Sequence, residues 1–169
     1  MKHIIGIDCS SKTIDAVILG EDKSWIDVLS VESKSKDMDI RFLELYYDFI
    51  TLLRTKFDLD KLNYYAIVEN PIFLQNVKTT VAITKVVAAA EIALSNCGIE
   101  FIGVDPKAWK KSVLADGNAN KEKIMNFAKA IWGSEITSQD LADAACLALW
   151  GVMRFGYENP ELLRERQKG

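Results

Sequence analysis

The stretch HIIGID, residues 3–8, decides the fold because it is a short apolar run that ends in a carboxylate. Its length and its β-branched residues are typical of a buried strand, which places Asp8 at the strand's C-terminal edge. The stretch YYAIVE, residues 64–69, repeats the pattern with Glu69 at its end, and an Asn-Pro pair then stops it. We therefore predict two buried strands, each with one acidic residue at its C-terminal end.

A second pair of acids lies on one predicted helix, QDLADAACLALW, residues 139–150. Asp140 and Asp143 are three residues apart, so a helix places them on the same face. Small and apolar residues surround Asp143, which favours a buried helix, and a buried carboxylate needs a compensating partner. Burying several like charges together is costly unless a cation offsets them.

We therefore expect the four carboxylates to hold one or two Mg²⁺ or Mn²⁺ ions, which are hard metals that prefer oxygen ligands. Such a site indicates phosphodiester hydrolysis. Each acid also has an ordinary explanation. Asp8 can be explained as a residue that favours a turn, and Glu69 as a solvated residue at a sheet edge. Asp140 can be explained as a negative charge that is favourable at the start of a helix. Only the four acids taken together favour the metal site.

Length and composition indicate one domain with a substantial core, because the chain has 169 residues of which 49% are apolar. We predict a single domain over residues 1–157 and a polar tail over 158–169. No apolar run approaches the roughly 18 residues of a membrane span, and the N-terminus lacks a signal-peptide pattern. The 3 cysteines lie far apart in the sequence. They are typical of a reducing compartment, so the expected location is cytoplasmic.

The formal net charge of −3 argues mildly against a nucleic-acid-binding protein, since such domains are usually basic. The four proposed metal ligands account for much of the negative charge, however. One segment is also locally basic and resembles a surface that contacts phosphates, although a solvated helix face explains it as well. Its lysines are Lys107, Lys110, Lys111, Lys121, Lys123 and Lys129.

The expected order of elements is three hairpin-linked strands, then a helix, a strand, a helix, a strand and terminal helices. This order describes the ribonuclease H-like α/β fold, a five-stranded mixed sheet flanked by helices. The last helix is expected to begin near Ser138, a good N-cap residue. The predicted strands are 3–8, 13–20, 24–31, 64–69 and 99–104, and the predicted helices are 37–57, 75–96, 106–115, 120–132 and the one that begins near 138.

Three motifs, Gly-Ile-Asp at 6–8, Val-Glu at 68–69 and DLADA at 140–144, together resemble the RuvC family of Holliday-junction resolvases. The likeness suggests a phage or plasmid member, acting in a bacterial host. It implies a Mg²⁺-dependent endonuclease, with Mn²⁺ as a substitute, that uses two ions to cut four-way or branched DNA. The residues that it implies as catalytic and metal-binding are Asp8, Glu69, Asp140 and Asp143.

The same resemblance assigns a catalytic lysine to Lys121 and a second lysine, in the preceding helix, to Lys110. Lys110 and Lys111 are then expected to bind DNA. An aromatic residue that probes the junction corresponds most nearly to Phe73, displaced by one position from the family pattern. On general grounds Phe73 and Trp109 are instead expected to be core residues.

The resemblance further implies a homodimer, because paired cutting requires two active sites held at a fixed distance. The predicted helix over 77–94 is apolar around most of its circumference, which indicates burial on two sides. One side would pack on the sheet, and the other would meet its twin at a seam that includes Ala89. The alternative is a central core helix covered wholly by its own chain.

Three other functions remain open from the sequence. Another ribonuclease H-like nuclease, acting on RNA–DNA hybrids or on branched DNA in general, would share the four acids. A sugar kinase or actin-like ATPase also begins with Gly-Ile-Asp after a strand, but that fold needs two such domains. A catalytically silent DNA-binding module is the third alternative, and the complete set of acids argues against it.

Overall fold

The computed structural model describes residues 2–57 and 63–155 of the chain. The predicted polar tail over 158–169 lies outside these residues, as does most of the connector that precedes the strand ending at Glu69. Within the described residues no helix is both long and apolar enough to cross a lipid bilayer.

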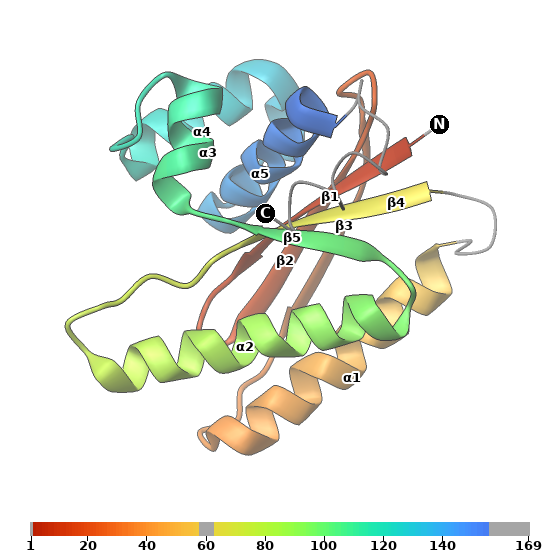
Figure 1. The fold of residues 1–169 in the computed structure, drawn as a ribbon, viewed down its shortest axis with the longest axis vertical. Helices are drawn as coiled ribbons and strands as arrows, with labels where there is room; N and C mark the ends of the chain where they lie inside the picture. Colours follow the sequence, from red (N-terminus) through yellow and green to blue (C-terminus); the bar gives the residue numbers. More distant parts are fainter. Residues whose placement is uncertain (1, 58–62, 156–169) are drawn as a thin grey trace, which may run out of the picture.

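A five-stranded mixed sheet forms the centre of the protein, in the order β3-β2-β1-β4-β5, and it confirms the predicted fold. The first three strands form an antiparallel meander, whereas β4 runs parallel to β1 and β5 parallel to β4 (Figure 1). The strand that carries Asp8 is therefore central and adjacent to the strand that carries Glu69. The strands are β1 (Lys2–Cys9), β2 (Thr13–Gly20), β3 (Trp25–Glu32), β4 (Asn63–Glu69) and β5 (Glu100–Val104).

Among the described residues, five α-helices cover the two faces of this sheet, α1 and α2 on one face and α3, α4 and α5 on the other (Figure 1). Their ends follow local capping chemistry. The Asn76 side chain accepts a hydrogen bond from the Thr79 amide, so α2 begins two residues later than predicted. The helices are α1 (Met38–Lys56), α2 (Val77–Asn96), α3 (Pro106–Leu114), α4 (Lys121–Trp132) and α5 (Gln139–Phe155), with a 3₁₀ turn at Gly133–Glu135.

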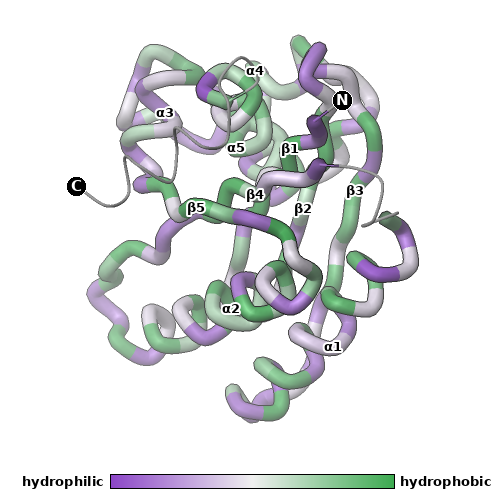
Figure 2. The backbone as a smooth tube through the Cα atoms, turned by 45° about the vertical axis from the view of Figure 1, so that its right-hand side comes forward, coloured by the Kyte–Doolittle hydropathy of each residue, from purple (hydrophilic) through white to green (hydrophobic). Residues whose placement is uncertain are grey.

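Successive side chains along each strand point to opposite faces of the sheet, so the sheet has a separate hydrophobic core on each face. Ile4 packs in the cluster on the α5 side, while Ile5 and Ile7 pack in the cluster on the α1 and α2 side. The hydropathy colouring in Figure 2 shows the apolar character of the central strands and of α5. Twelve residues of α5 are buried, which confirms that the helix carrying the paired aspartates is largely buried.

Two glycines allow α5 to lie very close to the sheet. A Cβ atom on Gly6 would meet the Ala144 carbonyl oxygen at 2.0 Å and the Ala148 backbone nitrogen at 2.3 Å. A Cβ atom on Gly151 would lie 2.6 Å from Cγ2 of Ile4. The backbone of α5 therefore rests directly on the backbone of β1 at Gly6, whereas at Gly151 it rests on the Ile4 side chain.

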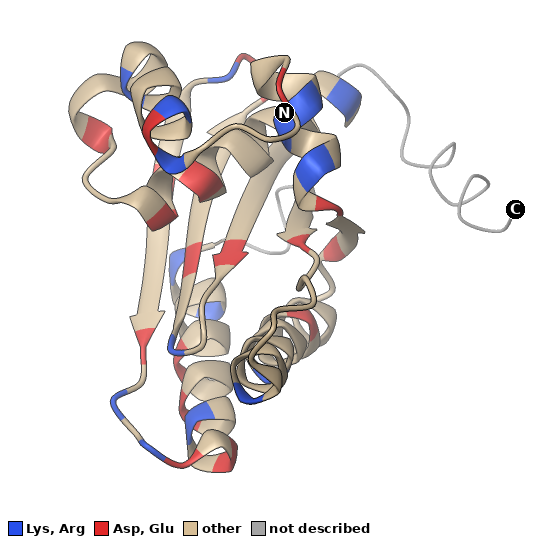
Figure 3. Cartoon of the chain, turned by 90° about the vertical axis from the view of Figure 1, so that its left-hand side faces the viewer, with Lys and Arg blue, Asp and Glu red and all other residues tan. Residues whose placement is uncertain are grey.

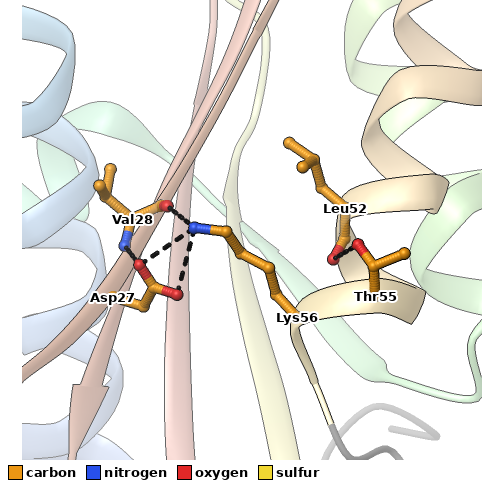
Figure 4. A network of polar contacts seen from close by, with 5 residues as sticks. All are labelled: Asp27, Val28, Leu52, Thr55 and Lys56. Atoms are coloured by element: carbon orange, nitrogen blue, oxygen red, sulfur yellow. Dashed lines mark hydrogen bonds and ion pairs between the residues drawn. The ribbon is translucent and has the colours of Figure 1, made fainter.

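The far end of α1 is tied to the edge strand of the sheet. Figure 4 shows Lys56, the last residue of α1, in contact with the Asp27 carboxylate on β3. The Nζ atom of Lys56 lies 3.3 Å from both carboxylate oxygens. The same Nζ lies 3.4 Å from the carbonyl oxygen of Val28. Both charged side chains are partly exposed, so this pair orients the helix end and adds little stability.

The packing of α2 corrects the expectation for Ala89 and shows that the chain covers only part of this helix. Ala89 is fully buried within its own chain, so its predicted place in a seam between two copies is wrong. The small side chain instead lets α2 pack closely inside the protein. The helix is not wholly covered by its own chain either, because Val77 is 73% exposed and Val81 is 41% exposed.

Replacing Gly6 with alanine tests the close approach of α5 to β1. We expect the free energy of unfolding to fall by about 1–3 kcal/mol or more, because the added methyl group meets backbone atoms that cannot rotate away. Urea denaturation measures the change. Gly117→Ala is the control, since its Cβ atom would lie 3.2 Å from the nearest atom, the Lys107 carbonyl oxygen. Equal losses in the two variants would contradict the argument.

Candidate active site

Three elements bring the predicted acids to one edge of the sheet. Ile7 pairs with Val68 in the parallel ladder between β1 and β4, so Asp8 and Glu69 follow at the same carboxyl edge. Asp140 and Asp143 lie in the first turns of α5, which passes over this edge of the sheet. The contact at Gly6 holds α5 there, since the backbone of Ala144, the residue after Asp143, meets it.

The charges of the other three acids all act on Asp8. Burial is the largest cause that raises the pKa of Asp8 well above its ordinary value, and the nearby charges of Asp143, Glu69 and Asp140 raise it further. Burial and then the charge of Glu69 raise the pKa of Asp143 to about 6. Burial also raises the pKa of Glu69. The structure thus brings the four carboxylates together as one electrostatic unit.

The chemistry of this unit fits a divalent cation. Its donors are carboxylate oxygens, the ligands that Mg²⁺ and Mn²⁺ prefer, and a cation would offset the repulsion that raises these pKa values. Over residues 2–57 and 63–155, however, no three acidic, histidine or cysteine side chains already form a metal-binding group. The carboxylates would have to turn toward a shared ion.

Trp109 on α3 holds one of the acids in place. Its side chain is fully buried, and its indole Nε1 donates a hydrogen bond of 2.5 Å to Oε2 of Glu69. This bond lowers the pKa of Glu69 and so opposes the effect of burial. The expectation that Trp109 is a core residue is confirmed, but its neighbours in the sequence gave no sign of this bond.

The predicted lysines differ in their relation to the acids. Lys110 lies with its Nζ atom 5.5 Å from the centre of the Trp109 ring, and its charge lowers the pKa of both Glu69 and Asp143. Lys111 is exposed on the same helix. Lys121 is the exposed first residue of α4, and no hydrogen bond or ion pair within the described residues joins it to any of the four carboxylates.

A fifth acid that the sequence analysis did not single out lies beside Asp8. Asp15 on β2 is its partner in the antiparallel ladder, so the two side chains share one face of the sheet. Asp15 is largely buried, and the Ser30 hydroxyl donates a hydrogen bond of 2.6 Å to its Oδ1 atom. Burial is the main reason that its pKa is raised. The hairpin predicted from residues 3–8 and 13–20 was the signal that could have revealed it, had its register been worked out.

Phe73 stands out from the protein instead of packing in it. The side chain is 99% exposed, in the connection between β4 and α2, and Ile72 beside it is 52% exposed. The expectation that Phe73 is a core residue is therefore wrong, because it lies beyond the end of β4, where no second layer covers the chain. Such an exposed ring is available to contact a ligand.

The sheet order, and the acids at the ends of β1 and β4 and on α5, define a protein of the ribonuclease H-like class. Residues 4–150 match the sequence model of one family within it, crossover junction endodeoxyribonuclease RuvC. The chain belongs to this family.

Individual relatives agree with this assignment. The chain is 34% identical over 84 residues to the crossover junction endodeoxyribonuclease RuvC of Brachyspira hyodysenteriae and 32% identical over 84 residues to that of Salinibacter ruber. These alignments cover 50% and 48% of this chain but only 52% and 47% of the relatives, so the chain spans about half of the curated relatives it matches.

Solved structures share the fold at low sequence identity. The Thermus thermophilus RuvC structure has a TM-score of 0.70 at 18% identity, with 91% of this chain and 96% of that chain covered. T. thermophilus RuvC in complex with a Holliday junction substrate has a TM-score of 0.71 at 19% identity, with 90% and 93% covered.

Replacing Trp109 with phenylalanine tests whether the indole tunes Glu69. The ring still fills the core, but the N–H donor is lost. Because that hydrogen bond lowers the pKa of Glu69, we expect this pKa to rise further, so that the carboxylate takes up its proton at a higher pH. A pH titration of the Glu69 carboxyl carbon by ¹³C NMR measures the change.

Trp132→Phe is the matched control, because Trp132 is also buried and its Nε1 donates to the carbonyl oxygen of Lys23 at 3.2 Å, away from the acids. The pKa of Glu69 should stay constant in this variant. A constant value in Trp109→Phe as well would exclude the proposed tuning.

Proposed function

We propose that this protein is a divalent-metal-dependent endonuclease that resolves four-way or branched DNA junctions by hydrolysing phosphodiester bonds. The observation that carries the proposal is the electrostatic unit of Asp8, Glu69, Asp140 and Asp143 at one sheet edge, in a chain of the RuvC family. The neighbour bound to a Holliday junction substrate supports the choice of DNA substrate. The cytoplasm of a bacterial host stays the predicted location.

In this proposal Asp8, Glu69, Asp140 and Asp143 would hold two Mg²⁺ ions, for which Mn²⁺ would substitute. A bound divalent ion supplies the Lewis-acid chemistry that polarises the phosphate and activates the attacking water. The chain itself places Asp8 centrally, between the acids of β4 and α5. The hydrogen bond from Trp109 holds Oε2 of Glu69, which would orient this one ligand while the other carboxylates turn toward the ion.

The lysines provide positive charge for the phosphate. Lys110 is the better supported of the two candidates for a role beside the reacting phosphate, because its charge already reaches Glu69 and Asp143. Lys121 remains a candidate catalytic residue, which would need the bound strand to pass the start of α4. Lys111 and Phe73 are both exposed, and we assign them to DNA contact, with Phe73 against a base.

We also propose a homodimer, because two cuts require two sites. An apolar groove of about 310 Å³ runs along the exposed side of α2, lined by Phe73, Leu74, Val77 and Val81 with threonines and Lys85. Covering this side with a second copy would bury Val77 and Val81 and would fix the distance between the two sites.

A cleavage assay with a labelled four-way junction, a flap, a duplex and an RNA–DNA hybrid tests the proposed function. With Mg²⁺ present, we expect the junction to be cut and Asp8→Asn to slow cutting at least ~10²-fold while DNA binding persists, because only ligand charge is lost. Asp105→Asn is the control, since it removes the same charge from another strand end while asparagine still caps α3. Preferential cutting of the hybrid would instead favour another ribonuclease H-like nuclease.

Val81→Glu tests the dimer. A charge in the exposed apolar side of α2 should shift the mass measured by light scattering at micromolar concentration toward the 19.0 kDa monomer, with an unchanged far-UV spectrum. Leu43→Glu serves as the control, because Leu43 is 50% exposed on α1, outside the groove. A wild-type protein that is monomeric and still resolves junctions would contradict the proposal.

A further inference from the structure

A second, cationic pocket lies beside the sheet edge, away from the carboxylates. It has a volume of about 250 Å³, and three positive side chains from three separate segments line it. Lys36 comes from the loop that leads into α1, Arg41 from the first turns of α1, and Lys78 from the start of α2. Figure 3 shows basic segments on the loop that runs from the sheet into α1. Ser11 and Thr79 add hydroxyl groups to the lining.

Arg41 makes this a built site and not a chance gathering of surface lysines. Its side chain is only 8% exposed, and Nε and Nη2 donate to the Ser35 carbonyl oxygen at 3.1 and 2.8 Å. Nη1 donates to the Ser11 carbonyl oxygen at 2.9 Å. These bonds use three of the five N–H donors of a guanidinium, which fixes its plane and leaves two donors for a ligand.

Neighbouring acids offset the charge of the pocket only in part, since the charge of Arg41 is among the lesser causes that lower the pKa of Asp37. No ion pair within the described residues involves Lys36, Arg41 or Lys78. Asp37, the adjacent acid, accepts hydrogen bonds from the Asp39 and Ile40 amides as the N-cap of α1, and these bonds are the main cause that lowers its pKa. A buried guanidinium that contacts only carbonyl oxygens therefore has a positive charge available for an anion.

The position of the pocket relates this anion to the proposed active site. Ser11 lies in the turn between β1 and β2, three residues after Asp8, so the pocket is at the same edge of the sheet as the carboxylates. It lies on the α1 and α2 side, whereas Asp140 and Asp143 lie on the α5 side. No residue lines both the pocket and the apolar groove, but Lys78 borders the groove, because Val81 and Lys85 lie three and seven positions further along the same face of α2.

We propose that this pocket binds a backbone phosphate of the DNA substrate, at a distance from the phosphate that is cut. The proposal rests on the proposed function, because it assigns a further contact to the same substrate. Lysine and arginine with hydroxyl groups are the usual partners of backbone phosphates, and such contacts fix the register of the nucleic acid without reading its sequence. The pocket would thus hold the strand on one side of the sheet edge while the acids act on the other.

The test measures junction binding by Lys36→Ala, Lys78→Ala and the double variant, all in an Asp8→Asn background that prevents cutting. Both lysines are exposed, so these changes should leave the fold intact, whereas replacing Arg41 would remove three internal hydrogen bonds. We expect each single variant to bind at least about threefold more weakly at low salt. The slope of log K against log[salt] should become shallower by about 1 for each.

Lys56→Ala is the control, because it removes the same charge at the opposite end of α1. Its affinity and salt slope should equal those of the parent. If the parent binds junctions and the double variant binds them with the same affinity and salt slope, the phosphate-binding role of the pocket is wrong. The proposed function is then unaffected. A parent that neither binds nor, with Asp8 restored, cuts any branched DNA would overturn the proposed function itself.

Inorganic phosphate distinguishes a DNA contact from a site for a free anion. If millimolar phosphate shifts the Ser11 and Thr79 amide resonances but the lysine variants bind junctions as tightly as the parent, the pocket is a site for a free anion and the DNA assignment is wrong. If phosphate shifts these resonances and also competes for the lysine-dependent part of junction binding, the assignment holds.

Discussion

The direct contact between the backbone of α5 and β1 is the constraint on which the rest of this structure depends. It exists because Gly6 has no side chain and because Gly151 relieves the second crossing, over Ile4. A side chain at either of these two positions would hold the helix farther from the sheet. Since Asp143 precedes Ala144, whose carbonyl oxygen meets Gly6, the contact that closes the core also sets the spacing between Asp143 and Asp8.

This arrangement works against the stability of the protein. Burial, with added repulsion from nearby acids, raises the pKa values of Asp8, Glu69 and Asp143. Ionising these groups therefore destabilises the folded state as the pH rises through their pKa range. The indole of Trp109 and the charge of Lys110 act in the opposite direction at Glu69. The chain tolerates the remaining cost because two extensive cores flank the sheet. Such local conflict between charge and burial is expected where groups are selected for chemistry.

Sequence reasoning could predict the strands and the placement of the acids because both follow from local patterns. The apolar runs ending at Asp8 and Glu69 have the period and length of buried strands, and parallel pairing then brings their ends together. It could not predict the bond between Trp109 and Glu69, because the two residues lie 40 positions apart and their contact depends on how α3 docks. The prediction that Ala89 lies in a seam between two copies failed for a related reason. Periodicity shows that a helix is apolar on most sides, but not which side its own chain covers.

The order of the elements along the chain has a consequence for synthesis of the protein. The acids of β1 and β4 belong to the first half of the chain, whereas Asp140 and Asp143 belong to α5, the last element that the structure describes. The backbone of α5 must also fill the surface over Gly6. A chain still attached to the ribosome therefore cannot assemble the full set of carboxylates until α5 has emerged and docked. Completion of the core and completion of the acidic site therefore both wait for the docking of α5.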